Sequence, residues 1–215
     1  MPSAASASKP VGTRMERRRL RTRQQIIEAA RELLLQVNYE DISAEAIAEL
    51  ADVGRSTFYN HFSNKQDAVL ATLSYHYRNY GEDAYVSAEQ EPDRAIAMIR
   101  TARELFHDMA NDALTRRLID QPRVLFGAIA ESQTDLMLRD LTDGLTQGRF
   151  QFIVDLDNLA TAMAWALVGV LIKAIGEDDV AAICDDWCRL ILINLGLSVT
   201  EIPEVLERAT TAAKY

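Results

Sequence analysis

Apolar residues recur every three or four positions along most of the chain, the spacing that gathers them on one face of an α-helix. The clearest early stripe consists of Ile26, Ile27, Ala30, Leu33, Leu34 and Val37. Thr22 and Gln25 have the spacing of a capping box, in which a hydroxyl and an amide satisfy the first backbone N–H groups. Asn38 is a residue type that tolerates the left-handed backbone ending many helices. The pattern therefore predicts a first helix that begins after Thr22.

Two short helices and a long one are expected next. Ser43 is a candidate N-cap before "AEAIAELA", and "DVG" reads as a tight connection in which Gly54 is free to adopt positive φ. A third helix is predicted from about Arg55 to His61. Ser63 with Gln66 suggests another capping box, which starts a long helix.

The remaining stripes are also helical, and no convincing strand pattern appears, so the predicted fold class is all-α. The segments 158–175 and 180–196 are apolar over most of their circumference. Such helices are buried inside a monomer or at an interface, and the pattern leaves both open. The apolar run of the first segment stops at Lys173, which is short for a membrane span, so no membrane association is expected.

The composition indicates a cellular compartment but no catalytic or metal-binding chemistry. With 215 residues, 48% of them hydrophobic, the chain is long enough for a core without metal or disulfide staples. Cys184 and Cys188 are its two cysteines; they make no disulfide framework, and buried structural thiols are favoured over a redox pair or metal site. No apolar signal-peptide core precedes the first helix. We expect a cytoplasmic protein with no cofactor and no bound metal.

Charge is distributed unevenly along the chain, whose formal net charge is -9. Against Glu16 alone, the first 23 residues contain Lys9, Arg14, Arg17, Arg18, Arg19, Arg21 and Arg23. "MPSAASASKPVGT" is rich in Ser, Ala, Pro and Gly, so residues 1–21 are predicted to be a disordered basic arm. Such an arm either meets a polyanion or is a solvated tail.

The third predicted helix carries the chemistry. Phe58 and Phe62 are its core residues, and polar hydrogen-bonding groups crowd the positions between and around them. A short helix before it and a polar exposed face describe a helix-turn-helix, whose second helix enters the major groove of DNA. Arg55 suits guanine and Asn60 suits adenine. The candidate DNA-contacting residues are Thr22, Ser43, Arg55, Ser56, Thr57, Tyr59, Asn60, His61 and Lys65. Of these, Tyr59, His61 and Lys65 are expected to contact phosphates.

These residues carry a family resemblance. "RQQIIEAARELLLQVNYEDISAEAIAELADVGRSTFYNHFSNKQDAVLATL", residues 23–73, resembles the N-terminal domain of the TetR family of bacterial transcriptional repressors, down to Thr57-Phe58-Tyr59, His61-Phe62 and Lys65. The resemblance implies a dimeric, all-helical regulator that dimerises through its last two long helices, here 158–175 and 180–196. Asn38 and Asp52 stand where the family often has glycine, and Gly54 stands where it often has a capping Ser or Thr.

The implied organisation is a basic arm (1–21), a DNA-binding domain (22–66) and a ligand-binding and dimerisation domain (67–215). The last of these is expected to hold an apolar pocket for an inducer of unknown identity. Candidate pocket residues are Tyr77, Phe106, His107, Phe126, Met137, Met163 and Trp165.

The favoured function is a ligand-responsive regulator, a repressor that a small molecule releases from a palindromic operator. A DNA-binding structural or division protein without an inducer is the alternative on the same scaffold. An α-helical enzyme is the third possibility, but the sequence contains no Gly-rich phosphate loop, zinc-ligand spacing or nucleophile motif, so no enzymatic activity is expected.

Overall fold

The computed structural model describes residues 13–211, without the side chains at 81–84, 87 and 211. Over this range the chain is helical with no strand, which confirms the all-α prediction. The helices are α1 (Arg14–Gln36), α2 (Ala44–Leu50), α3 (Arg55–Tyr59), α4 (Lys65–Ala88), α5 (Arg94–Asn111), α6 (Ala113–Arg117), α7 (Pro122–Thr146), α8 (Leu156–Ala174), α9 (Val180–Asn194) and α10 (Ile202–Thr211), with a 3₁₀ turn at Tyr39–Asp41.

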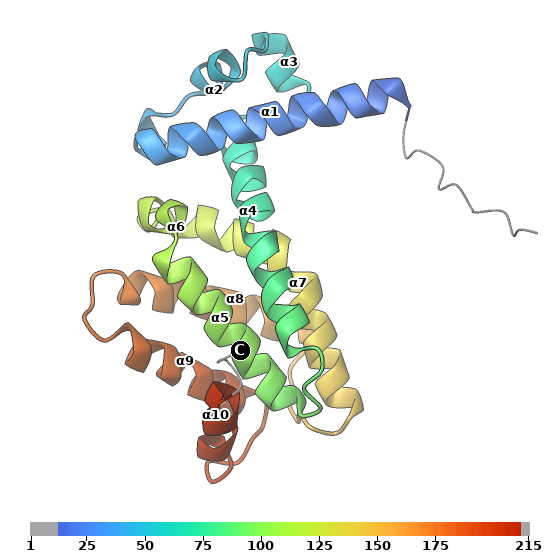
Figure 1. Ribbon diagram of the computed structural model, residues 1–215, viewed down its shortest axis with the longest axis vertical. Coiled ribbons are helices and arrows are strands. Elements are labelled where there is room, and N and C mark those ends of the chain that lie inside the picture. Colours follow the sequence, from blue (N-terminus) through green and yellow to red (C-terminus); the bar gives the residue numbers. More distant parts are fainter. Residues whose placement is uncertain (1–12, 212–215) are drawn as a thin grey trace, which may run out of the picture.

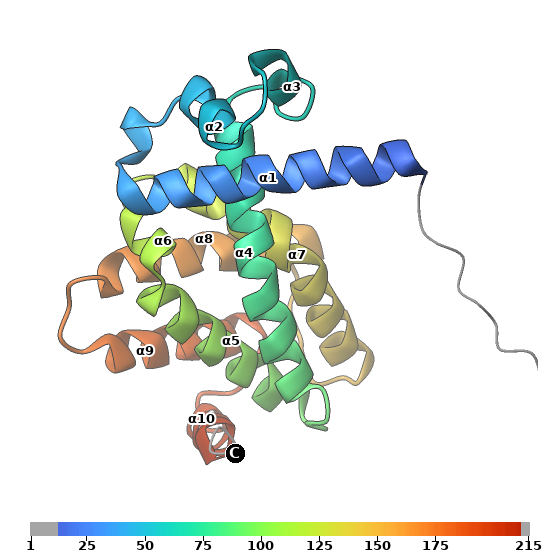
Figure 2. The same ribbon diagram turned by 45° about the horizontal axis from the view of Figure 1, so that its top comes forward.

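The helices form a small head on a larger body. Helices α1, α2 and α3 make the head, and α4 runs from it into the body built by α5 to α10 (Figure 1). The turned view in Figure 2 shows α1 lying across α4, with the first part of α1 extending well beyond the rest of the head. Phe58 and Phe62 are buried in the head core as predicted, together with Ile26 and Ile47.

Helix α1 begins at Arg14, so its predicted start after Thr22 is wrong. Thr13 is the N-cap, and its hydroxyl and the Glu16 carboxylate form the capping box. Residues 14–21 are consequently an exposed basic helix and not a disordered arm, while residues 1–12 lie outside the described range. Arg, Leu and Met are good helix formers, so the helix continues toward the N-terminus until it reaches a threonine able to cap it.

The tight turns also differ from expectation. Asp52, not Gly54, takes the left-handed backbone, with φ of 52°. Gly54 caps α3 in an extended conformation (φ −65°) and offers no side-chain bond. Asn38 is extended as well (φ −70°) and is not the left-handed end of α1. Asp52, which stands where the resembled family often has glycine, thus takes the left-handed backbone, and the left-handed backbone expected at Asn38 and Gly54 is wrong.

The N-cap of helix α4 is Asn64, one residue later than the predicted cap Ser63. The Asn64 side chain accepts from the Asp67 backbone N–H at 2.9 Å, and the Ser63 backbone N–H donates to the Asp67 carboxylate at 3.1 Å. The predicted pair of Ser63 and Gln66 is therefore wrong by one position: an amide and a carboxylate satisfy the same backbone groups.

Helices α8 and α9 close the body and carry the longest apolar stretches. Gly176 and Gly196 end them with φ of 98° and 84°, as their positions in the sequence suggest. Helix α8 is long and apolar enough to cross a membrane, the one such helix among the described residues, a test that core helices of soluble proteins also pass. Only 39% of its apolar window is buried inside the chain, which leaves much apolar surface facing outward.

A polar network ties the body to α4 where the head begins. Asp112 caps α6 and accepts from His76 of α4 at 2.8 Å, and Tyr77 of α4 bonds Thr115 of α6 at 2.8 Å. Burial by itself would raise the pKa of Asp112, but the hydrogen bonds from His76 and Thr115 outweigh it and the pKa lies below its ordinary value. The Arg117 guanidinium adds a bond to the Val37 carbonyl at 3.3 Å, so α6 is held to both α4 and the head.

We predict that Gly196→Ala destabilises the protein far more than Gly148→Ala. Both glycines have positive φ, which costs a residue with a Cβ about 1–2 kcal/mol. A Cβ at Gly148 meets nothing within 4 Å, whereas one at Gly196 falls 2.0 Å from the Gln151 carbonyl oxygen. Urea denaturation should therefore show a loss of roughly 3 kcal/mol or more for Gly196→Ala. Equal losses for the two variants would contradict the close approach at Gly196.

Candidate nucleic-acid interface and body cavity

The exposed face of α3 is polar, and its opposite face is anchored. Phe58 is fully buried, and its ring packs edge-on against Tyr59 and at a tilt against Phe62. On the outer side Arg55, Ser56 and Asn60 are exposed, with Thr57 half-buried beside them. The structure therefore brings five of the predicted contact residues onto one short surface: Arg55, Ser56, Thr57, Tyr59 and Asn60.

Arg55 is held loosely. Its guanidinium pairs with the Glu45 carboxylate of α2 at 2.9 Å and lies 5.7 Å from the centre of the Tyr59 ring. The Arg55 and Glu45 side chains are 70% and 51% exposed, and ion pairs in such positions contribute about 0–1 kcal/mol. A stronger anionic or bidentate partner is thus able to replace Glu45 at little cost.

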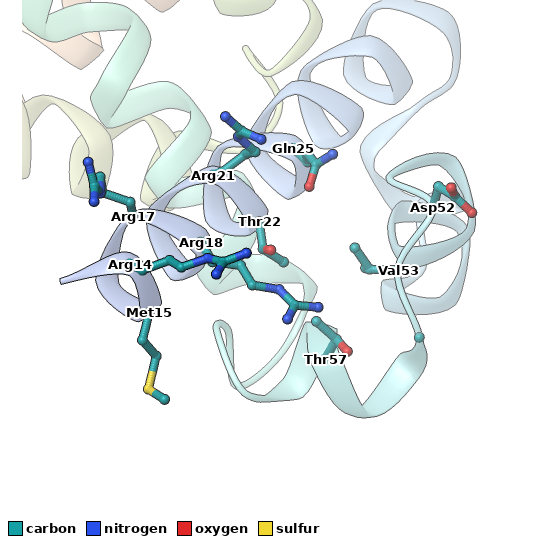
Figure 3. Close-up of a pocket in the computed structure, with 11 residues that line it drawn as sticks. Arg14, Met15, Arg17, Arg18, Arg21, Thr22, Gln25, Asp52, Val53 and Thr57 are labelled. Atoms are coloured by element: carbon teal, nitrogen blue, oxygen red, sulfur yellow. The ribbon is translucent and has the colours of Figure 1, made fainter.

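A basic groove adjoins this face. It has a volume of about 1120 Å³ and lies between the first turns of α1 and the turn that leads into α3 (Figure 3). From α1, Arg14 and Arg18 extend toward Thr57, with Thr22 farther along the same wall. The full lining is Arg14, Met15, Arg17, Arg18, Arg21, Thr22, Gln25, Asp52, Val53, Gly54 and Thr57. Four arginines against one carboxylate make the groove strongly basic.

His61 and Ser43, two further predicted contacts, have different roles in the head. Burial, followed by the charges of Arg19 and Arg23, lowers the pKa of His61, so its imidazole is neutral at pH 7 and offers a hydrogen bond rather than a charge. Ser43 caps α2, its hydroxyl accepting from the Ala46 N–H at 3.0 Å. Of these two predicted contacts, only His61 retains a free polar function in the described arrangement.

Lys65 does not have the surroundings predicted for it. Its ammonium donates to the carbonyls of Tyr39, Glu40 and Ile42 at 2.9, 3.2 and 2.8 Å, and it lies 4.6 Å from the centre of the Tyr39 ring. A phosphate contact was expected here. The structure instead uses this lysine to hold the end of the 3₁₀ turn onto the start of α4.

The body contains a small cavity between α5, α7, α8 and α9. Its volume is about 50 Å³, and its lining is Met98, Thr101, Ala102, Leu105, Gln133, Leu136, Met137, Asp140, Met163, Leu167, Trp187 and Ile191. Asp140 is paired with the buried guanidinium of Arg94. Burial raises the pKa of Asp140, and the nearby Arg94 charge only partly opposes that effect.

Two of the seven predicted pocket residues line this cavity, Met137 and Met163. Tyr77 is buried against Thr115, and Phe106 packs on the Trp187 ring from behind the lining. Phe126 and Trp165 stack on each other 4.0 Å apart near the surface, and His107 is exposed beside Asn111. Sequence reasoning missed Thr101, Gln133, Asp140 and Trp187; polar residues inside apolar helical stripes were the signal available for them.

The two cysteines do not form a metal site with other side chains of the described residues. Cys188 is buried and Cys184 is half-buried on α9, and both are free thiols. Within residues 13–211, no group of three or more His, Cys, Asp or Glu side chains is placed to hold a metal ion.

A known protein family matches the sequence of the head. The family described as "Bacterial regulatory proteins, tetR family" matches residues 26–72. Residues 26–72 are a helix-turn-helix domain of the tetR family. This confirms the resemblance inferred from the sequence and makes α2 and α3 the two helices of the motif, in a tetR-type head on a helical body.

Curated relatives share this head. The chain is 39% identical over 71 residues to the HTH-type transcriptional regulator TcmR of Streptomyces glaucescens, covering 33% of this chain and 31% of TcmR. It is 36% identical over 98 residues to TtgR of Pseudomonas putida, covering 45% of this chain and 47% of TtgR. The matches thus span about a third to a half of these regulators.

Solved structures extend the similarity of fold to most of the chain. RolR in complex with resorcinol has a TM-score of 0.75 at 24% identity, covering 91% of this chain and 96% of RolR. FadR of Thermus thermophilus in complex with lauroyl-CoA has a TM-score of 0.65 at 21% identity, covering 82% and 96%. At these identities the likeness establishes a shared fold.

We predict that Lys65→Met lowers the free energy of unfolding by roughly 2 kcal/mol, because three carbonyls lose a charged donor. Gln66→Met is the matched control, an exposed position on the same turn of α4. Urea denaturation of both variants measures the difference. Unchanged stability, together with weaker and less salt-dependent DNA binding, would instead support the phosphate contact expected from the sequence.

Proposed function

We propose that the protein is a ligand-responsive, DNA-binding transcriptional regulator, a repressor that a small molecule releases from a palindromic operator. The observation that carries the proposal is the tetR-family head. Its α3 exposes Arg55, Ser56 and Asn60 beside a groove lined by arginines. On a chain of net charge -9, this concentration of basic groups at one end accounts for how an acidic protein meets a polyanion.

Recognition follows from the shape of the head. Helix α3 enters the major groove, where Arg55 exchanges Glu45 for a guanine and Asn60 reads an adenine. The arginines at the start of α1 neutralise phosphates beside the site, and this part of the affinity is independent of sequence. Because these arginines stand on a helix, they are pre-ordered for that contact.

A second copy of the chain completes the site. Helices α8 and α9 expose apolar side chains: Trp165, Ile172, Leu190 and Ile193 are 43%, 41%, 52% and 53% exposed. The exposed positions of α8 also include the small residues Ala162, Ala166 and Gly169, and a Cβ at Gly169 would meet nothing within 4 Å. Two copies packed through segments 158–175 and 180–196 bury this surface and present two α3 helices for half-sites about 34 Å apart.

The ligand acts through the body. One protein of the same fold was solved with resorcinol and another with lauroyl-CoA, and we propose that this body likewise binds a small molecule. A ligand that binds better to the DNA-free arrangement of the two heads lowers operator affinity by that difference. Such a regulator works in the cytoplasm, where the DNA is.

We predict that changes in α3 and α1 weaken DNA binding in different ways. Arg55→Ala should lower affinity for the operator about 10- to 100-fold and leave binding to unrelated duplexes nearly unchanged, because a base contact is lost. Replacing Arg14, Arg17 and Arg18 with Gln should weaken both equally and reduce the log–log salt slope by roughly 0.9 per lost phosphate. Fluorescence anisotropy across a salt series measures both effects.

Arg208→Gln is the control for these variants, since Arg208 is an exposed arginine of α10 in the body. Its affinity and salt slope should match those of the parent protein. If all three variants behave alike, the head is not the DNA-binding surface.

We predict that Ile193→Asp converts the protein from a dimer to a monomer and abolishes tight operator binding. A carboxylate in the centre of an apolar interface is left without a partner. Val199→Asp is the control, because Val199 is 80% exposed and lies beyond the end of α9. Light scattering gives the mass of the parent protein and of both variants. A parent protein that is monomeric at micromolar concentration would contradict the proposed dimer.

A further inference from the structure

Two adjoining cavities in the body share one partition. The cavity described above occupies about 50 Å³, and a second hollow of about 70 Å³ opens between α8 and α9 on the exposed face that carries Ala162, Ala166 and Leu190. Met163, Trp187 and Ile191 line both. Methionine is flexible and adapts its shape to a neighbour. A rotation of Met163 therefore suffices to join the two spaces, which together approach the ~150 Å³ of a cavity that holds benzene.

Unpartnered polar groups lie at this partition and beside it. Trp187 is 4% exposed, and its indole N–H has no hydrogen-bond partner. The Thr101 hydroxyl, on the α5 side of the first cavity, is also buried without a partner. Buried donors and hydroxyls are normally satisfied, so two in the lining of one cavity need an explanation.

The charge of the one carboxylate in the lining of the first cavity is already neutralised. Asp140 lines the first cavity and is paired with Arg94, each less than a tenth exposed. A carboxylate has about four lone-pair sites, so Asp140 keeps acceptor capacity after this pairing. A ligand with a net charge would lack a counter-charge here, whereas a neutral hydroxyl finds both acceptors and donors.

From this arrangement we infer that the joined cavities bind a neutral, single-ring compound that carries at least one hydroxyl group. The methionine and leucine side chains of the lining contact the ring. A ligand oxygen accepts from the Trp187 N–H, and a ligand hydroxyl hydrogen goes to Thr101 or Asp140. The volume excludes a long acyl chain. The role of this compound as the effector rests on the proposed function; its binding does not.

The test uses phenol, toluene and dodecanoate as probes of the full-length protein by calorimetry. Phenol and toluene have nearly the same shape but differ in the hydroxyl, and dodecanoate is long and charged. We expect Trp187→Phe to weaken phenol binding about tenfold, equivalent to roughly 1.4 kcal/mol, with toluene binding unchanged. Tyr75→Phe is the control, an exposed aromatic side chain of α4 outside both cavities, and should leave both affinities as they are.

A second variant separates a binding role from a structural one. Thr101→Val keeps the shape and removes the unpartnered hydroxyl, so the ligand-free protein should be at least as stable as the parent while phenol affinity falls. Lower stability of the ligand-free variant would mean that the hydroxyl serves the fold. No binding of phenol, equal losses for phenol and toluene in Trp187→Phe, or preferential binding of dodecanoate would each overturn the inference.

The outcomes also distinguish this site from the proposed function. If phenol binds as expected and the protein does not bind DNA, the inferred ligand site is supported and the proposed regulatory function is contradicted. If operator DNA is bound but no single-ring compound enters the cavity, the regulator stands and the site is wrong.

Discussion

Helix α4 is the element on which the rest of the structure depends, because it belongs to two cores at once. Near its start Ala68 and Val69 are buried in the head, and the Thr72 hydroxyl donates to the Ile27 carbonyl of α1 at 3.3 Å. Farther along, Tyr77 is buried in the body. A helix that is packed at both ends transmits a change of position from one to the other, so the head cannot move independently of the body.

A hydrogen bond connects the lining of the body cavity to this helix. The Gln133 amide lines the cavity and donates to the Tyr77 carbonyl of α4 at 2.6 Å. On the other face of α4, His76 and Tyr77 hold α6 through Asp112 and Thr115. A ligand that repositions Gln133 therefore acts on the segment of α4 from which the head is carried. The two properties of the proposed regulator, DNA binding and response to a ligand, meet at this segment.

Much of this architecture was accessible from the sequence, and the failures have physical causes. Helical periodicity, the buried pair of Phe58 and Phe62, and the polar face of α3 were predictable because local spacing determines them. The start of α1 was not, since Thr13 and Thr22 are both able to cap a helix. Asp52 and Gly54 compete for the left-handed role in the turn between α2 and α3, and tertiary packing gives it to Asp52, while Asn38 at the end of α1 is extended.

The site residues divide in the same way. Exposure on a short helix follows from its pattern, so the α3 contacts were within reach. The hydrogen bonds of Lys65 were not predictable, because its partners are the backbone carbonyls of Tyr39, Glu40 and Ile42, and carbonyls are present at every residue and leave no mark in a sequence. The cavity was mostly missed because its lining comes from four helices whose registers are set only when they pack together.

The most direct test of the account is selection of bound duplexes from a random-sequence DNA pool by the purified protein. The account holds that two copies of one α3 face read DNA across a twofold axis. It predicts enrichment of an inverted repeat whose half-sites are centred about one helical turn, or a whole multiple of a turn, apart. Enrichment of an asymmetric sequence, or none over the starting pool, would contradict it.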